Sequence, residues 1–144
     1  MRKITFLLGL IFATMLVAKP TVSIQDQKML VTNGETSYVL APNGDDASYF
    51  WASVSPDGKH LVYVTARYGT FVCDINGENV RSMGRMNAPK WLDNNHVAGM
   101  QEFYTGHDEI DHVRYIPRSI DGKVTRDLDA AEQANFIQAE EARI

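Results

Sequence analysis

Cysteine is almost absent from this chain, which has 144 residues and one cysteine, Cys73. A single thiol excludes any disulfide within the chain, so the fold depends on packing and hydrogen bonds. Cys73 lies within an apolar run, residues 71–75, that is typical of a strand. In that setting we expect a small buried hydrophobic side chain rather than a reactive thiol.

Sequence signatures of catalysis and of cofactor binding are also absent. The chain has no Gly-x-Ser-x-Gly elbow, no glycine-rich phosphate loop and no His-Glu-x-x-His zinc motif. We therefore predict no catalytic residues, no cofactor and no metal ligands. The sequence favours a protein without catalytic machinery of its own.

One segment keeps a metal-dependent alternative open. If residues 107–112 form a strand, His107, Glu109 and Asp111 lie on one face of it. Such side chains can bind a divalent metal, with a fourth ligand supplied from elsewhere in the chain. The simpler interpretation of the segment from His107 to His112 is a solvated hairpin of mixed charge.

Positive charge is scarce relative to negative charge. The formal net charge is −4 at pH 7, and it becomes −6 if Arg2 and Lys3 are removed with the N-terminal segment. Nucleic-acid binding depends on clusters of lysine and arginine that neutralise phosphates. We therefore expect no nucleic-acid partner.

Only one long hydrophobic run is present, and it lies at the N-terminus. Arg2 and Lys3 precede an uncharged apolar stretch, residues 4–17, and Ala18 follows it directly before Lys19. This order is typical of a secretory signal peptide, and the run is shorter than the ~20 residues that span a bilayer. We predict a signal peptide over residues 1–18, a periplasmic or secreted protein, and no membrane span after cleavage. An uncleaved anchor is the alternative.

Short runs rich in β-branched and aromatic residues recur from residue 22 to residue 128. The expected strands are residues 22–24, 29–32, 38–41, 49–54, 61–65, 70–75, 80–82, 88–91, 97–101, 109–116 and 123–128. Asn-Gly or Asp-Gly pairs, which suit hairpin turns, occur at 33–34, 43–44, 57–58, 76–77 and 121–122. Since no long amphipathic helix separates the runs, we predict an all-β fold of consecutive antiparallel hairpins.

The expected strands also repeat along the chain. Residues 28–31, 59–62 and 95–98 resemble one another, and each segment begins just after a turn. A further turn with a glycine follows each copy, at Gly44, Gly77 and Gly122. The spacing fits loosely the ~40–45 residues of a four-stranded propeller blade.

One segment carries a family resemblance. Its motif consists of Trp51, Ser55, Pro56, Asp57, Gly58 and Lys59, and is continued by Asn76, Gly77 and Trp91. The motif resembles the blade repeat of TolB-type, WD-like β-propellers, although Leu92 and Asp93 depart from that pattern in the next copy. The strand over residues 60–65 is partly apolar on both faces, as expected for a sheet packed between two neighbours. The resemblance implies a partial β-propeller of consecutive antiparallel blades over residues 19–128.

The predicted blades are too few for a closed ring, because propellers usually close with four to eight blades and residues 19–128 hold about three. The resemblance therefore implies an incomplete ring, with the chain either part of a longer protein or completed by self-association. Residues 129–144 contain good helix formers after Asp129, which can cap a helix. We expect them to form a helical or disordered tail.

The functional expectation follows from the blade motif, the N-terminal segment and the missing catalytic motifs. We expect an exported, non-catalytic binding or scaffold module that holds a protein or peptide partner of the cell envelope at loops on one rim. The alternative is the propeller portion of a prolyl-oligopeptidase-type peptidase or a carbohydrate-active enzyme that lacks its catalytic part. Trp51 and Trp91 are expected to pack between blades, with a grip on a ligand as the other role open to them.

Overall fold

The computed structural model describes residues 18–123 and 127–141, which form three antiparallel sheets and one α-helix. The first sheet contains β1 (Thr21–Gln25), β2 (Lys28–Asn33) and β3 (Thr36–Leu40). The second contains β4 (Tyr49–Val54), β5 (His60–Thr65), β6 (Gly69–Asp74) and β7 (Arg81–Gly84). The third contains β8 (Asn87–Asp93), β9 (His96–Thr105) and β10 (Glu109–Ser119). A 3₁₀ turn, η1 (Asp45–Ala47), precedes β4, and α2 (Ala130–Glu141) follows the third sheet.

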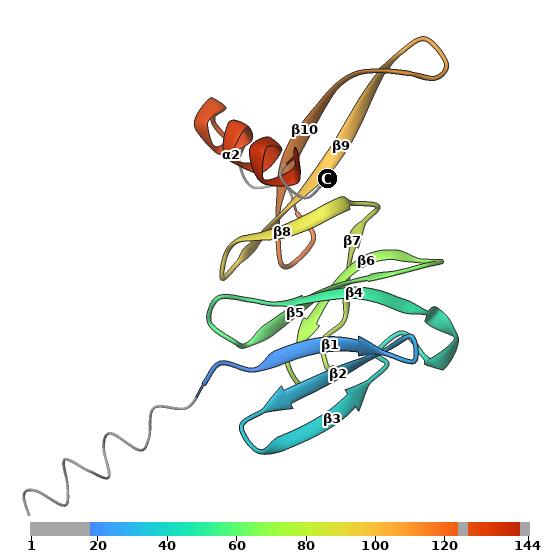
Figure 1. Cartoon of the computed structure of the whole chain (residues 1–144), viewed down its shortest axis with the longest axis vertical. Helices are drawn as coiled ribbons and strands as arrows, with labels where there is room; N and C mark the ends of the chain where they lie inside the picture. Colours follow the sequence, from blue (N-terminus) through green and yellow to red (C-terminus); the bar gives the residue numbers. More distant parts are fainter. Residues whose placement is uncertain (1–17, 124–126, 142–144) are drawn as a thin grey trace, which may run out of the picture.

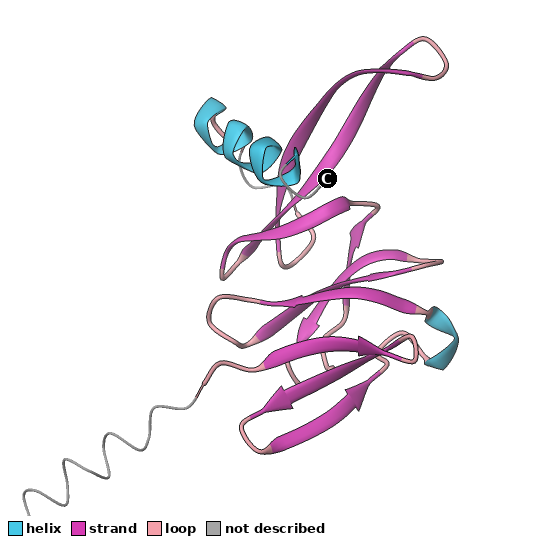
Figure 2. Ribbon diagram, in the orientation of Figure 1, coloured by secondary structure: helices cyan, strands magenta, loops and turns pink. Residues whose placement is uncertain are grey.

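The three sheets stack in chain order, as Figure 1 shows, and each is an antiparallel meander (Figure 2). The second sheet is packed on both faces. On β5, Leu61 belongs to a buried cluster with Met29 and Val31 of the first sheet, whereas Val62 belongs to a second cluster with Val97 of the third sheet. Because side chains alternate along a strand, these adjacent residues reach opposite neighbours. The expectation that this strand is buried on both faces is confirmed.

Polar groups also connect neighbouring sheets. The backbone N–H of Tyr49 on β4 donates to the carbonyl of Gln27, in the β1–β2 turn, at 2.8 Å. The indole N–H of Trp91 on β8 donates to the carbonyl of Ser53 on β4 at 3.0 Å. Since β4 is an edge strand of the second sheet, the first bond gives the Tyr49 N–H a partner outside its own sheet, and the second bond ties the third sheet to β4.

The outer face of the first sheet is polar along β1, although Leu30 and Val39 lie on the same face and Val39 is exposed. On β1, Thr21, Ser23 and Gln25 are exposed, while Val22 and Ile24 alternate with them and pack on the buried cluster that joins the first two sheets. A sheet at the end of a stack has only one neighbour, so a polar face on the other side suits solvent.

The outer face of the third sheet is covered by α2. The ring of Phe136 stacks on Tyr115 with 4.8 Å between centroids. The amide of Gln133 bonds the backbone of Tyr115 twice, accepting from its N–H at 2.8 Å and donating to its carbonyl at 2.6 Å. Asp129 caps the helix as expected, because its Oδ1 accepts from the N–H of Glu132 at 2.8 Å.

Equivalent hydrogen bonds recur in the second and third sheets. The N–H of Ile75 donates to the carbonyl of Lys59 at 2.9 Å, and the N–H of Ile120 donates to the carbonyl of Asn95 at 2.8 Å. Lys59 and Asn95 each immediately precede the second strand of their sheet. The similarity between residues 59–62 and 95–98 therefore reflects a structural repeat.

The blade motif forms the β4–β5 turn. The Ser55 hydroxyl donates to Oδ1 of Asp57 at 2.6 Å, and the Lys59 N–H donates to the same oxygen at 3.1 Å. The His60 N–H donates to the Ser55 hydroxyl at 3.0 Å, and Gly58 takes a φ of 75° that suits glycine. The Ser55 hydroxyl, followed by the Lys59 amide, lowers the pKa of Asp57.

Replacing Asp57 with alanine should lower the free energy of unfolding by about 1 kcal/mol at neutral pH. Because the pKa of Asp57 is lowered in the folded chain, its contribution is fully present above the ordinary value of 3.8 and is lost as the pH falls through the folded-state pKa. Urea unfolding at pH 7 and pH 3 checks this, with Asp108→Ala in an exposed turn as the control. A difference between wild type and Asp57→Ala that persists undiminished at pH 3 would contradict the assignment.

The structure corrects two details of the expected fold. The strand expected over residues 123–128 is not found where the segment is described, because Lys123, Asp127 and Leu128 lie outside any strand. Residues 124–126 lie outside the described part of the chain. Two Asx-Gly pairs do not join hairpin strands: 43–44 leads into η1, and 121–122 follows β10. The β1–β2 hairpin uses Asp26 and Gln27 instead, which take positive φ without a glycine.

The all-β class and the short C-terminal helix are confirmed, and each strand expected before residue 117 is present. The described residues form no closed ring of sheets. The signal peptide predicted over residues 1–18 lies, except for Ala18, outside the described residues. No helix in the described part of the chain is long and apolar enough to cross a bilayer.

Candidate functional site

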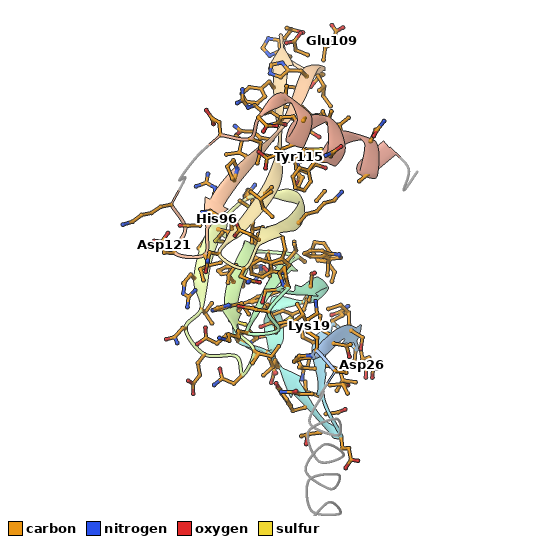
Figure 3. All side chains as sticks on the ribbon, turned by 90° about the vertical axis from the view of Figure 1, so that its left-hand side faces the viewer. Lys19, Asp26, His96, Glu109, Tyr115 and Asp121 are labelled. Atoms are coloured by element: carbon orange, nitrogen blue, oxygen red, sulfur yellow. The ribbon has the colours of Figure 1, made fainter. Side chains whose placement is uncertain are left out.

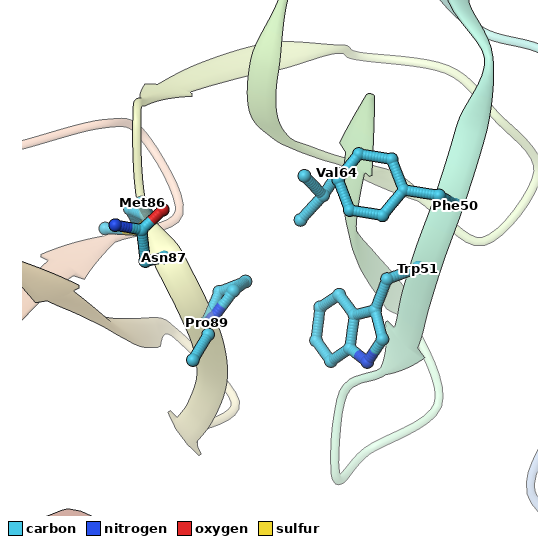
Figure 4. Close-up of a pocket in the computed structure, with 7 residues that line it drawn as sticks. Phe50, Trp51, Val64, Met86, Asn87 and Pro89 are labelled. Carbon is cyan, nitrogen blue, oxygen red and sulfur yellow. The ribbon is translucent and has the colours of Figure 1, made fainter. Parts of the chain in front are cut away.

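A cleft of about 360 Å³ opens between the second and third sheets (Figure 4). One wall comes from β4 and β5, and the other comes from the start of β8 and the residue before it. The lining residues are Phe50, Trp51, Val64, Met86, Asn87, Ala88 and Pro89. Figure 4 shows Trp51 and Phe50 on one side, across from Pro89 and Asn87 on the other.

A bulge in β4 places two aromatic rings at this cleft. Tyr49 pairs with Thr65 and Trp51 pairs with Val64, so Phe50 is an extra residue without a partner. The insertion shifts the alternation of β4, because a bulge changes the face to which the following side chains point. Tyr49 is fully buried against the first sheet, whereas Phe50 remains 59 % exposed beside Trp51.

The facing wall contains a second irregularity. The pairing of β8 with β9 shifts between Asn87 and Lys90, and Ala88 takes a φ of 47° in the left-handed region that alanine rarely adopts. Such strain costs about 1–3 kcal/mol and persists only where the surroundings impose it. The Thr70 hydroxyl donates to the Met86 carbonyl at 3.2 Å and helps to hold the entry to β8.

A glycine on β9 allows Met86, one of the lining residues, to pack closely against that strand. A Cβ atom on Gly99 would lie 2.5 Å from Cγ of Met86, far inside van der Waals contact. The Met86 side chain therefore rests directly on the backbone of β9. Any larger residue at position 99 would displace Met86 and reshape the cleft.

The side chains that line the cleft are apolar or aromatic, except for the amide of Asn87. None of the residues that line the cleft is ionisable, so the lining offers no general acid, general base or charged nucleophile. The Asn87 amide can donate and accept hydrogen bonds, while Phe50, Trp51 and Pro89 offer apolar contact. This combination suits an apolar side chain together with the peptide groups beside it.

The residues of the blade motif fall into two places. Trp51 lines the cleft, whereas Trp91 packs with it in the buried cluster between the second and third sheets and is bonded to Ser53. The turn from Ser55 to Lys59 lies at the other end of β4 and β5. Asn76 and Gly77 form the β6–β7 connection, where the Asn76 carboxamide accepts from the Glu78 N–H at 3.1 Å. Apart from Trp51, the motif builds turns and packing.

The segment from His107 to His112 forms the exposed end of the β9–β10 hairpin. His107 lies in the turn, and the register shifts between Ile110 and His112. The His112 ring stacks on Phe103 at 4.6 Å, and its Nδ1 lies 2.8 Å from Oδ2 of Asp111. In the described part of the chain no three histidine, cysteine or acidic side chains are grouped as metal ligands.

Cys73 on β6 is fully buried opposite Leu61 of β5, in the cluster between the first two sheets. Burial, with a smaller contribution from the charge of Asp74, raises the pKa of its thiol to about 12. The thiolate is therefore strongly disfavoured at neutral pH. The expectation of a small buried hydrophobic side chain is confirmed.

Comparisons with known proteins found no matching family model, no matching curated protein and no matching solved structure.

Proposed function

We propose that this chain is a non-catalytic binding module that holds an extended peptide segment of a protein partner in the cleft between its second and third sheets. The cleft supports the proposal because two aromatic rings and an amide converge on a space of about 360 Å³ without any ionisable group. Irregular backbone on both walls, at Phe50 and Ala88, supports it further, since such irregularities cluster at binding sites.

We also propose that the protein is exported and that it is related to partial, TolB-like β-propellers. The face-to-face stack of consecutive antiparallel sheets and the equivalent bonds of Ile75 and Ile120 support a blade repeat. The basic start and apolar run of residues 2–17 support export to the periplasm or the medium. An N-terminal sequence that begins at Lys19 in protein recovered from the periplasm is the test of export.

Peptide binding at the cleft is tested by selecting random displayed peptides on the immobilised chain from Lys19 onward. We expect selection to converge on peptides with an apolar anchor residue. Phe50→Ala should weaken the selected peptides about tenfold or more, because exposed aromatic anchors dominate such contacts. Titration followed by tryptophan emission measures the affinity, since Trp51 lies in the cleft wall.

Tyr68→Ala is the matched control, because Tyr68 is also aromatic and 51 % exposed but lies in the β5–β6 turn and is not one of the residues that line the cleft. The control should bind the selected peptides as tightly as the wild type does. Equal binding by Phe50→Ala and the wild type, or no convergence of the selected sequences, would refute a peptide site in this cleft.

A further inference from the structure

The β9–β10 hairpin extends beyond the sheet stack as an arm, defined here as residues 101–113 (Figure 1). Its ladder continues to the pair formed by Thr105 and Glu109. Figure 3 shows Glu109 at one end of the molecule, well beyond Tyr115, which lies beside α2. The arm thus presents backbone away from the core that the sheets share.

The third sheet leaves one edge of this arm unpaired. In the second sheet, the third strand β6 is covered by β7, with Val72 opposite Arg81. In the third sheet β10 is itself the edge strand, and no described strand pairs with its outer side. An unpaired edge of this kind is a template for a strand from another chain.

A side chain of α2 already binds this edge of β10 in the way that a peptide group would. The Gln133 amide, which has the hydrogen-bonding pattern of a peptide group, bonds both the N–H and the carbonyl of Tyr115. Val113 lies two residues further along, so its peptide groups point the same way. Among the described residues, Val113 pairs only with Glu102 of β9. A neighbouring cleft of about 350 Å³ has room for a side chain of an added strand, and its lining is His112, Val113, Arg114, Leu128, Ala130, Gln133 and Ile137.

The charge of the arm indicates what kind of strand fits. The arm carries four carboxylates, at Glu102, Asp108, Glu109 and Asp111. The nearest cation on β10 is Arg114, which lies 3.8 Å from Asp127. Two copies of the arm would place like charges opposite each other, which destabilises a strand pair, whereas a basic strand would neutralise them.

Apolar contact is available next to these charges. Tyr104 and Ile110 face each other across the ladder near the tip, and they are 54 % and 50 % exposed. A strand that alternates apolar and basic residues would therefore meet Tyr104 and Ile110 on one face and the carboxylate of Glu109 on the other.

We propose that the outer edge of β10 in the arm receives an extended basic segment of a partner protein by strand addition. This site is separate from the cleft between the second and third sheets. Backbone bonds from residues around Val113 supply the affinity, and the carboxylates of the arm select positive charge.

The test uses two labelled octapeptides, one alternating valine and lysine and the other alternating valine and glutamate, with the chain from Lys19 onward. The valine–lysine peptide should bind at least about tenfold more tightly. Val113→Pro removes the outward N–H and should weaken that binding about tenfold or more. Val113→Ala keeps the N–H and is the control, and Pro117 on the same strand shows that this edge accommodates proline.

Glu109→Lys combined with Asp111→Lys gives a second variant that leaves the ladder groups in place, and it should also weaken binding of the valine–lysine peptide. Equal binding by Val113→Pro and Val113→Ala, or equal binding of the two peptides, would overturn strand addition of a basic segment. A concentration-dependent dimer that Val113→Pro abolishes would overturn it too, because the occupant would then be a second copy of the chain.

Discussion

Replacing Leu61 with alanine should lower the free energy of unfolding by about 2–5 kcal/mol. Leu61 is fully buried at the centre of β5 and packs in the cluster between the first and second sheets. The change removes apolar contact and leaves a cavity that neighbours from two separate sheets cannot both fill. Urea unfolding monitored by circular dichroism measures the loss as a shift in the transition midpoint.

The matched control for Leu61→Ala is Val39→Ala. Val39 is also an aliphatic strand residue, but it lies on β3 with 60 % of its side chain exposed. Its replacement should change the free energy of unfolding by less than about 0.5 kcal/mol. A similar, small effect for both variants would show that β5 is not buried against the first sheet.

Replacing Trp91 with alanine should cost about 3 kcal/mol of stability. The indole packs in the cluster between the second and third sheets, and it donates to the Ser53 carbonyl on β4. The change removes the apolar ring and the hydrogen bond donated by its N–H at the same time. The same urea titration measures the result.

Trp91→Phe separates the two contributions of the indole. The phenyl ring keeps most of the apolar contact and loses the N–H, so we expect a cost of about 1 kcal/mol, the net value of one hydrogen bond. If Trp91→Phe is as damaging as Trp91→Ala, the hydrogen bond rather than the packing holds the two sheets together. If neither change destabilises the chain, the second and third sheets do not stack through Trp91.

Much of the fold could be predicted from the sequence because each strand carries its own local signal. Residues 49–54 match the bounds of β4, and the helix after Asp129 begins where the cap predicted it. The double-sided apolar pattern of residues 60–65 identified the strand that packs between two sheets. Turn chemistry was less informative, because Asp26 and Gln27 form a tight turn without glycine while Asn43-Gly44 does not join two strands.

The residues of the candidate sites could mostly not be predicted from the sequence, because their positions depend on irregularities of the backbone. Nothing in residues 49–51 marks Phe50 as an inserted residue, since a bulge depends on the register against β5. Likewise, Ala88 has no local reason to adopt a positive φ, so the position of Asn87 at the cleft could not be foreseen. Trp51 was the one lining residue with a sequence signal, and that signal pointed first to packing.

The length of the arm was a further difference between sequence and structure. The sequence predicted strands at 97–101 and 109–116, whereas β9 continues to Thr105 and pairs with the start of β10. Residues 102–105 contain one charged residue, Glu102, followed by Phe103, Tyr104 and Thr105, which favour strands but do not alternate apolar with polar side chains. Their pairing comes from the ladder with β10, which is a tertiary effect.

The second sheet is packed between the first and the third, and methyl nuclear Overhauser effects can detect both contacts. Leu61 and Val62 are adjacent on β5, yet they belong to clusters on opposite faces. We predict cross-peaks from Leu61 methyls to Val31 of the first sheet and from Val62 methyls to Val97 of the third. Cross-peaks from both residues to the same sheet, or none from Val62 to residues of β9, would contradict this packing.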